Sequence, residues 1–492
     1  MVNIMAKSPS RPAGVKGSAQ RPALRKTAAV ADKKTYAVSR NADLELTVTA
    51  LDDEGFGTAR IEGTIVKIGG TIPGDVLVVR VDHAAHGLAF AHVKRMITPS
   101  PLRSRRPPCR ESNDCLGCPL IAMKYTEQLV WKRGLMLSEL ARHDDLKGVP
   151  VLPPLAPDNL IHYRTTAKLT VAGKFSNPFI GIYRRATHDV YDLDDCALHH
   201  PLINRVVAVA RRGITSLKVP IYNPHSKMGL LRYLVVRVSV SEKTAMVVFV
   251  TAQRSYNEIH HLARYMQKEM PEIKVVAQNV NSSEGNVIMG SKDHFLTTQH
   301  HLTERIGEVA FRISPRSFFQ VNNSGARLIY STVREWSGLT GQETVLDVYC
   351  GIGGIALYLA DRARQVIGIE VVQEAVADAA ANARLNRRDN CRFEAGDAAE
   401  LLEELADELE TVDVAVLNPP RKGCDAEVLK RVVALAPRTI LYVSCSPSSL
   451  ARDLALLAPL GYVCREIQPV DMFPQTVHVE NVARLENIDK NC

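Results

Sequence analysis

From Thr344 onward, short apolar segments alternate with segments of helical character, and this alternation constrains the fold more than any other feature of the chain. It predicts a doubly wound parallel sheet with helices on both faces. Such sheets bind ligands in the loops that follow the carboxyl ends of their strands, so we expect the functional residues there. The expected strands are TVLDVY, QVIGIE, CRFEAGD, VDVAVLN and TILYVS, with a final pair that begins near Tyr462.

The remainder of the chain must form further domains, because 492 residues exceed the size of one ordinary core. From Ala42 to about Ile97, alternating apolar runs broken by Gly and Pro predict a small antiparallel barrel, a fold that often binds oligonucleotides. The segments DDEGFGTARIEG and GGTIPGDVLVVRV resemble a TRAM domain, an OB-like RNA-binding barrel, and a purely structural barrel is the alternative. We predict a basic tail over 1–37, the TRAM β-barrel over 38–98, a central α+β domain over 99–315 and an α/β domain over 316–492.

Positive charge is concentrated near the start of the chain. The formal net charge is +8, and the first 35 residues contain many Lys and Arg residues but only Asp32 as an acid. We predict a disordered, solvated tail, with an RNA-tethering arm or an organellar transit peptide as alternatives. The sequence has no secretory signal and no run of about 18 apolar residues, so we expect a cytoplasmic protein with no membrane partner. In that compartment its cysteines are expected to be thiols or metal ligands.

A glycine-rich turn, DVYCGIGG from Asp347 to Gly354, follows the first strand of the alternating region. Glycines let a backbone approach a ligand closely, and Glu370 at the end of the next strand suits the two hydroxyls of a ribose. A nicotinamide enzyme is the rival interpretation, but the GxGxxG pattern is absent. Together with EAGD, which ends at Asp397, these segments resemble the Rossmann-like SAM-binding half of class I methyltransferases. The resemblance implies that Asp397 lies beside the adenine.

A Pro-Pro turn, NPPR from Asn418 to Arg421, ends the fourth expected strand. Two prolines make such a turn rigid, so it would hold the Asn418 side chain at a fixed place, beside the reacting methyl group of SAM. A plain strand-terminating turn is the alternative. The same tetrad occurs in amine methyltransferases, so it does not identify the atom that accepts the methyl group.

Cys445 lies between the strand TILYVS and a helix that we expect to begin near Pro447. A helix amino terminus lowers the pKa of a thiol and favours the nucleophilic thiolate, although a small buried residue is the alternative. Carbon 5 of uracil is a poor nucleophile until a thiolate adds to carbon 6, and its proton must afterwards be removed by a base. We expect that base in TVHVE, where strand alternation puts His478 and Glu480 on one face, although a surface carboxylate is the alternative for Glu480.

The motifs LDVYCGIGG, GIE, NPPRKG, SCSPSSLARD and DMFPQTVHVE resemble, in this order, those of the RNA 5-methyluridine methyltransferase family. The resemblance implies a SAM-dependent enzyme with Cys445 as the nucleophile and Glu480 as the proton acceptor. Many relatives carry Asp in place of Asn418. Cys350 and Cys424 are expected to be packing residues. Methyltransferases that act on carbon 5 of cytosine sometimes place the attacking Cys beside the Pro of the fourth-strand motif. In this sequence NPPR has no cysteine there, so cytosine is the less expected base. The SAM contacts that the resemblance implies are Gln320, Tyr349, Glu370 and Asn418.

Cys109, Cys115 and Cys118 form a C-x5-C-x2-C triplet, and Cys196 lies far downstream in DLDDCALHHP. Four thiolates suit zinc or an iron–sulfur cluster, and spacing does not separate the two; four unrelated thiols are the alternative. Ribosomal RNA members of the family carry this spacing with a [4Fe-4S] cluster, so the resemblance implies that cluster. Because methyl transfer requires no electrons, we infer a structural or RNA-positioning role for it.

The expected partner is RNA. A stacked uracil hides its carbon 6, so the target must lie in a loop or be flipped out of the helix. A barrel together with a cysteine cluster resembles the enzymes of 23S ribosomal RNA more than the compact transfer RNA enzymes. We therefore expect a monomer that methylates a uridine of 23S ribosomal RNA. A transfer RNA uridine, another RNA position and a non-catalytic iron–sulfur RNA-binding factor are the alternatives.

Overall fold

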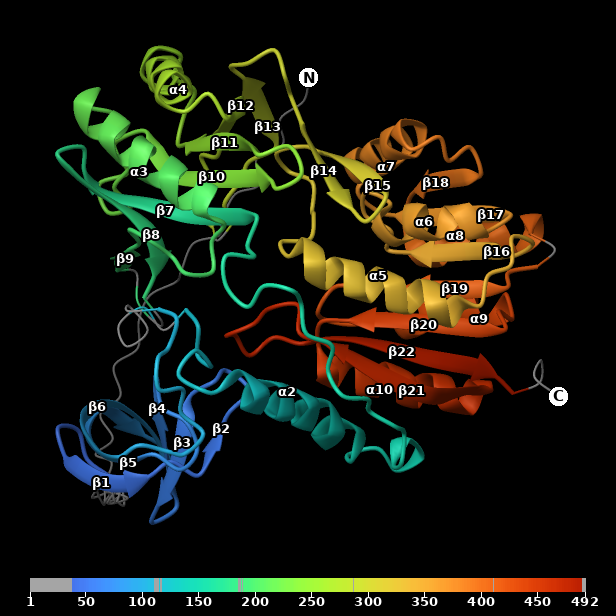
Figure 1. The fold of residues 1–492 in the computed structure, drawn as a ribbon, viewed down its shortest axis with the longest axis horizontal. Coiled ribbons are helices and arrows are strands. Elements are labelled where there is room, and N and C mark those ends of the chain that lie inside the picture. Colours follow the sequence, from blue (N-terminus) through green and yellow to red (C-terminus); the bar gives the residue numbers. More distant parts are fainter. Residues whose placement is uncertain are drawn as a thin grey trace, which may run out of the picture.

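The computed structural model describes residues 38–109, 115, 117–184, 187, 189–285, 287–409 and 411–488. The expected basic tail, residues 1–37, lies outside the described residues. Figure 1 shows an amino-terminal sheet at the lower left, a central sheet above it and a larger carboxyl-terminal domain on the right. Among the helices of the described residues, none combines the length and the apolar character required to span a bilayer.

The amino-terminal sheet has six strands in the order β1-β5-β6-β4-β3-β2. Its edge strands β1 and β2 are separated only by Val48 and Thr49, so the chain steps from one edge to the other and the sheet curls as predicted. Alternate side chains of β4 and β5 point inward, and Val66, Ile68 and Leu77 are fully buried among them. The strands are β1 Asp43–Thr47, β2 Ala50–Leu51, β3 Gly57–Ile61, β4 Thr64–Ile68, β5 Val76–Ala85 and β6 Leu88–Thr98.

The central sheet has seven strands in the order β13-β12-β11-β10-β7-β8-β9, antiparallel except for the pair β11 and β12. Helices α3 and α4 bury their apolar sides against one face, which gives the predicted α+β arrangement (Figure 1). The hairpin of β14 and β15 then leads into the next domain. The elements are β7 Thr166–Lys174, β8 Asn177–Tyr183, β9 Val190–Asp192, α3 Pro201–Ser216, β10 Leu231–Ser239, β11 Thr244–Thr251, α4 Asn257–Glu269, β12 Ile273–Val280, β13 Lys292–Phe295, β14 Leu302–Ile306 and β15 Val309–Ile313.

The carboxyl-terminal sheet has the order β18-β17-β16-β19-β20-β22-β21. Its first five strands are parallel, which confirms the alternation read from the sequence, and β22 lies antiparallel between β20 and β21. The elements are α5 Asn323–Ser337, β16 Thr344–Val348, α6 Gly354–Leu359, η2 Ala360–Arg362, β17 Gln365–Glu370, α7 Gln373–Leu385, β18 Cys391–Ala395, α8 Ala398–Glu408, β19 Val414–Leu417, α9 Ala426–Ala434, β20 Thr439–Ser444, α10 Pro447–Leu457, η3 Ala458–Leu460, β21 Tyr462–Val470 and β22 Glu480–Asn487.

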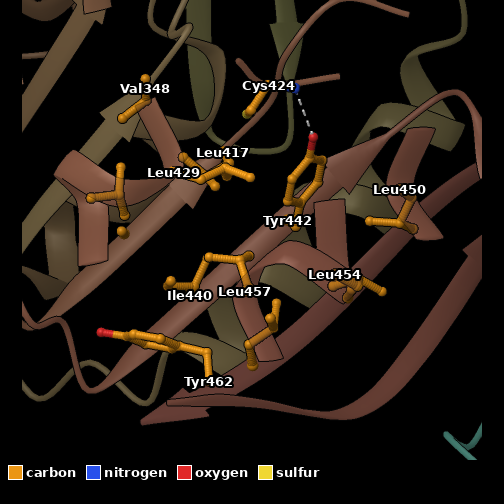
Figure 2. Close-up of a cluster of buried hydrophobic side chains, with 14 of the residues drawn as sticks. Val348, Leu417, Cys424, Leu429, Ile440, Tyr442, Leu450, Leu454, Leu457 and Tyr462 are labelled. Atoms are coloured by element: carbon orange, nitrogen blue, oxygen red, sulfur yellow. Dashed lines mark hydrogen bonds between the residues drawn. The ribbon is translucent and has the colours of Figure 1, made fainter. Parts of the chain in front are cut away.

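Strand β20 is buried on both faces, as a central strand of a doubly wound sheet must be. Ile440 and Tyr442 point to one face and Leu441 points to the other. Figure 2 shows the first face, where Leu454 of α10 and Tyr462 pack around Ile440. Burial of one such side chain contributes roughly 1.5–3 kcal/mol, so this layer fixes α10, and the residue that precedes it, against the sheet.

Helix α2, Tyr125–Leu140, precedes the central sheet in the sequence but packs on the carboxyl-terminal domain. Its residues Met136 and Leu140 share a buried cluster with α10 (Figure 1). The chain then passes through η1, Asp144–Leu146, and runs beside β21, where the Leu152 amide donates to the Ile467 carbonyl at 2.8 Å. The edge strand of the sheet is therefore covered by a segment that lies more than three hundred residues earlier.

Candidate active site

A cavity of about 870 Å³ opens at the carboxyl ends of the parallel strands. Strand β16 leads into the glycine turn, β17 ends at Glu370, β19 leads into the Pro-Pro turn and β20 leads into Cys445, so the topology delivers all four segments to one edge. The structure thus brings together all seven residues that the sequence assigned to catalysis or SAM contact. These residues are Gln320, Tyr349, Glu370, Asp397, Asn418, Cys445 and Glu480.

The glycine turn is shaped by steric demands that only glycine meets. Gly353 has a φ of 81°, and a Cβ there would lie 3.1 Å from the Phe393 ring. A Cβ on Gly354 would lie 2.5 Å from the Tyr330 hydroxyl. Side chains at these two positions would therefore collide with Phe393 and Tyr330, so the turn requires glycine there.

Two carboxylates that the sequence assigned to SAM also hold the backbone around the cavity. Glu370 accepts hydrogen bonds from the Gly351 amide at 3.2 Å and from the Val372 amide at 2.9 Å. Asp397 is the N-cap of α8 and accepts from the Ala399 amide at 2.9 Å. Each carboxylate oxygen has lone pairs to spare, so neither role prevents a contact with a ligand.

Cys445 is half-buried directly before α10, whose first turn is capped by Ser446. We expected the helix amino terminus to lower the pKa of this thiol, but the pKa is raised above its ordinary value. Burial is the main cause and the nearby Glu480 carboxylate adds to it, while the Arg421 guanidinium opposes both and hydrogen-bonds to the thiol. The position of Cys445 is therefore as predicted, whereas the expected lowering of its pKa is not seen, because burial and Glu480 outweigh Arg421 and the backbone hydrogen bond.

Glu480 is the first residue of β22, and burial raises its pKa to about 8, with Arg421 acting in the opposite direction. A carboxylate with this pKa binds a proton more readily than an exposed one. His478 also lines the cavity, but it lies in the loop before β22 and not on a shared strand face. Both residues nonetheless line the cavity, one from the loop and one from the start of β22, which strand alternation did not predict.

Arg421 lines the same cavity and acts to lower the pKa of both Cys445 and Glu480, and sequence reasoning gave it no role although it ends the NPPR tetrad. Its loop is pinned to α10, where Asp453 accepts from the Cys424 amide at 2.8 Å and from the Tyr442 hydroxyl (Figure 2 shows Tyr442 beside Cys424). A Cβ on Gly423 would lie 2.5 Å from the Asp453 carboxylate. The sequence could have indicated Arg421, because the rigid Pro-Pro turn that precedes it fixes where it lies.

Aromatic side chains form the outer wall of the cavity. Phe318 lines it and is 71% exposed, and Phe473 lines it from the loop before β22. An exposed ring at a cavity mouth offers a stacking surface for a planar group such as a nucleobase. Sequence reasoning quoted RSFFQVN only for Gln320 and missed Phe318.

The four cysteines of the predicted metal site line a second, small pocket of about 30 Å³, together with Ile121, Leu193 and Leu198. Burial raises the pKa of the Cys118 thiol, and the neighbouring Cys196 and Cys115 raise it further. In the described part of the chain, no three His, Cys, Asp or Glu side chains lie close enough to hold a single metal ion. The four thiols therefore share one pocket without the close grouping that a single metal ion requires.

Comparisons with known proteins address the chain as a whole. Residues 155–488 match the family described as tRNA (uracil-5-)-methyltransferase, and residues 39–94 match the TRAM domain. An uncharacterized RNA methyltransferase of Geobacter sulfurreducens is 57% identical over 91% of this chain and 90% of the relative. Another, from Halalkalibacterium halodurans, is 36% identical over 92% of this chain and 99% of the relative.

Among solved structures, the tRNA (uracil-54, C5)-methyltransferase of Pyrococcus abyssi, in complex with S-adenosyl-L-homocysteine, is similar to this chain. The two are 27% identical, with a TM-score of 0.73 over 90% of this chain and 100% of that structure. The likeness therefore extends over all three sheets and is not confined to the carboxyl-terminal domain.

Proposed function

Because this chain belongs to the tRNA (uracil-5-)-methyltransferase family, we propose that it transfers a methyl group from SAM to carbon 5 of a uridine in 23S ribosomal RNA, through a covalent bond between Cys445 and carbon 6. The observation that carries the proposal is the grouping of Cys445, Arg421 and Glu480 in one cavity. A thiol, a cation and a proton acceptor are the groups that this reaction requires.

The residues act in sequence. The Cys445 thiol loses its proton to solvent, Arg421 stabilises the resulting thiolate, and the thiolate adds to carbon 6 of the uracil as the electron pair of the 5,6 double bond moves toward carbon 5 and the carbonyl. Carbon 5 would then take the methyl group that bound SAM supplies, with S-adenosyl-L-homocysteine as the leaving group. Glu480 removes the carbon 5 proton, the double bond forms again and the thiolate leaves. Each turnover thus frees Cys445 as a thiolate and leaves one proton on Glu480, in place of the thiol proton that was lost to solvent.

SAM would occupy the part of the cavity next to the glycine turn. We assign Glu370 to the ribose hydroxyls and Asp397 to the adenine end, where the loops after β17 and β18 meet. Asn418 would face the sulfonium through its amide oxygen. The remaining assigned contacts are Gln320 and Tyr349.

The RNA substrate is the second part of the proposal. A TRAM domain and four convergent cysteines support 23S ribosomal RNA as the substrate, and we propose that the enzyme is monomeric and cytoplasmic. The similar structure from Pyrococcus abyssi is a transfer RNA enzyme, which makes a transfer RNA uridine the second candidate.

One assay decides among these substrates. The protein is incubated with unmodified ribosomal RNA or transfer RNA and methyl-labelled SAM, and the RNA is digested to nucleosides. We expect label in 5-methyluridine from 23S ribosomal RNA. Label only in transfer RNA would establish the second candidate, label in another nucleoside would refute uridine methylation, and absence of label from every RNA would favour a non-catalytic RNA-binding factor.

The four cysteines are proposed to hold a [4Fe-4S] cluster with a structural role. Cys118 precedes α2, whereas Cys196 follows β9 of the central sheet, so a group bound to both would tie these parts together. We expect protein purified without oxygen to contain iron and acid-labile sulfide and to absorb visible light. Cys118→Ser should lose these properties and Cys391→Ser, outside both cavities, should keep them. A colourless protein loaded with zinc would refute the assignment.

A further inference from the structure

The loop between β21 and β22, residues 471–479, forms one side of the cavity. It carries Phe473 and His478 and ends at Glu480, all of which line the cavity. Cys445 reaches the same cavity from β20 and α10, which are separate elements. The position of Glu480 relative to Cys445 therefore depends on the contacts that hold residues 471–479 in place.

Helix α2 holds the loop through polar side chains on its buried face. The Tyr125 hydroxyl donates to the Asp471 carboxylate at 2.9 Å. About two turns further along, the Lys132 ammonium contacts the same carboxylate at 2.5 Å and the Phe473 carbonyl at 3.0 Å. The side chains of Lys132 and Asp471 are both completely buried. In Figure 1 the red loop before β22 extends toward the amino end of α2.

Gln128 lies between these two residues on the same face of α2 and is also completely buried. Its amide oxygen accepts from the Gln475 backbone amide at 3.0 Å, and its amide nitrogen lies 2.9 Å from the Gln475 side-chain oxygen. The same nitrogen lies 3.0 Å from the carbonyls of Leu120 and Met123. Gln128 thus contacts two separate segments, the loop at Gln475 and the chain at Leu120 and Met123.

The second segment is the one that carries the cysteines. Leu120 follows Cys118 by two residues, and its amide donates directly to the Gln475 carbonyl at 3.1 Å. The barrel joins at the same place, because a Cβ on Gly55 would lie 2.4 Å from Pro119 and 2.7 Å from Val477. Three parts of the molecule therefore meet on the loop that leads to Glu480.

We infer that Gln128 is a positioning residue, which holds this loop so that Glu480 faces the carbon 5 proton and which links the loop to the cysteine segment. Hydrogen bonds are directional, whereas apolar packing is not, so this arrangement fixes orientation as well as attachment. The inference rests on the proposed function, because it assigns Gln128 to the step in which Glu480 removes the proton. It predicts that loss of Gln128 slows release of the RNA more than attack by Cys445, which lies on another element.

The test compares Gln128→Met, which keeps the volume and removes every hydrogen bond, with Tyr125→Phe, which removes only one. Ser138→Ala is the control, since Ser138 is exposed on the same helix and bonds only to the Leu135 carbonyl among the described residues. Three quantities are measured: kcat, the steady-state fraction of enzyme bound covalently to RNA, and hydrogen exchange of the 471–479 amides. The affinity for S-adenosyl-L-homocysteine is measured as well, because it reports on the SAM side of the cavity, which these substitutions do not touch.

We expect Gln128→Met to lower kcat by about tenfold or more, since small misplacements of a catalytic group have effects of this size. The covalent fraction and the exchange of the loop should rise, while S-adenosyl-L-homocysteine affinity stays within about twofold of wild type. Tyr125→Phe, which loses one hydrogen bond to the same loop, should change kcat, the covalent fraction and the exchange of the loop in the same direction but by less. It therefore still tests whether α2 holds the loop if Gln128→Met does not fold.

Unchanged exchange and an unchanged covalent fraction in both variants would overturn the inference. A parallel fall of kcat, melting temperature and ligand affinity without a rise in the covalent fraction would reduce Gln128 to a purely structural role and would also overturn it. If neither wild type nor Glu480→Gln ever forms the covalent species, the proposed function fails instead. Loop exchange would then still decide whether Gln128 holds residues 471–479.

Discussion

Glu480→Gln protein, mixed with substrate RNA and SAM, is expected to accumulate as a covalent complex with RNA that already carries the methyl group. Glutamine has nearly the shape of glutamate but cannot accept the carbon 5 proton, so the thiolate cannot leave. Loss of a general base typically slows a step by about 10²–10⁴-fold. The complex is measured on a denaturing gel with end-labelled RNA, and methyl-labelled SAM shows whether transfer preceded the arrest.

The pH dependence of release provides an independent check on the same residue. Burial raises the pKa of Glu480 to about 8, so the carboxylate form is abundant above that pH and is replaced by the protonated form below it. Release by wild type should slow as pH falls from about 9 to 6. Glu486→Gln, on the same strand but outside the cavity, is the control and should release RNA as wild type does. Fast release by Glu480→Gln would show that another group removes the proton.

Cys445→Ala is expected to abolish both methyl transfer and the covalent complex, with a loss of at least about 10³-fold in rate. Without the thiolate, carbon 5 stays unreactive toward the sulfonium even when both ligands are bound. S-adenosyl-L-homocysteine should still bind, because its assigned contacts lie on other loops. The measurement is methyl incorporation into RNA under single-turnover conditions.

Cys464→Ala is the matched control for this substitution. Cys464 is buried in β21 and does not line the cavity, so its removal should leave methyl transfer intact. Methyl transfer by Cys445→Ala at the wild-type rate would contradict the covalent mechanism. A variant that transfers methyl groups at the wild-type rate must be folded and must bind SAM, so this result could not be attributed to a failure of folding.

Much of the site followed from the sequence because parallel strands gather their carboxyl ends at one edge. The order of strands and helices after Thr344 was sufficient to bring Glu370, Asn418 and Cys445 into the same place. Cys196 was added to the cysteine triplet only as a distant fourth thiol, since nothing local in the sequence relates it to Cys118. The structure places both in one pocket.

The properties that sequence did not predict arise from contacts between distant segments. The pKa of Cys445 depends on burial and on Glu480 and Arg421, which are brought to it by the fold. The pairing of Lys132 with Asp471 joins residues 339 positions apart. Neither residue has a local pattern that marks it, because a lysine within a helix usually reaches solvent. Long-range polar pairs of this kind become visible only in three dimensions.

Strand β22 is inserted between β20 and β21, although β21 precedes it in the chain. During synthesis, β21 therefore leaves the ribosome without a partner strand beside β20 and must wait until β22 has followed. Glu480, the proposed proton acceptor, arrives on that same strand. On the proposed mechanism, a nascent chain therefore completes its sheet only when it also carries the carboxylate that allows release of the RNA.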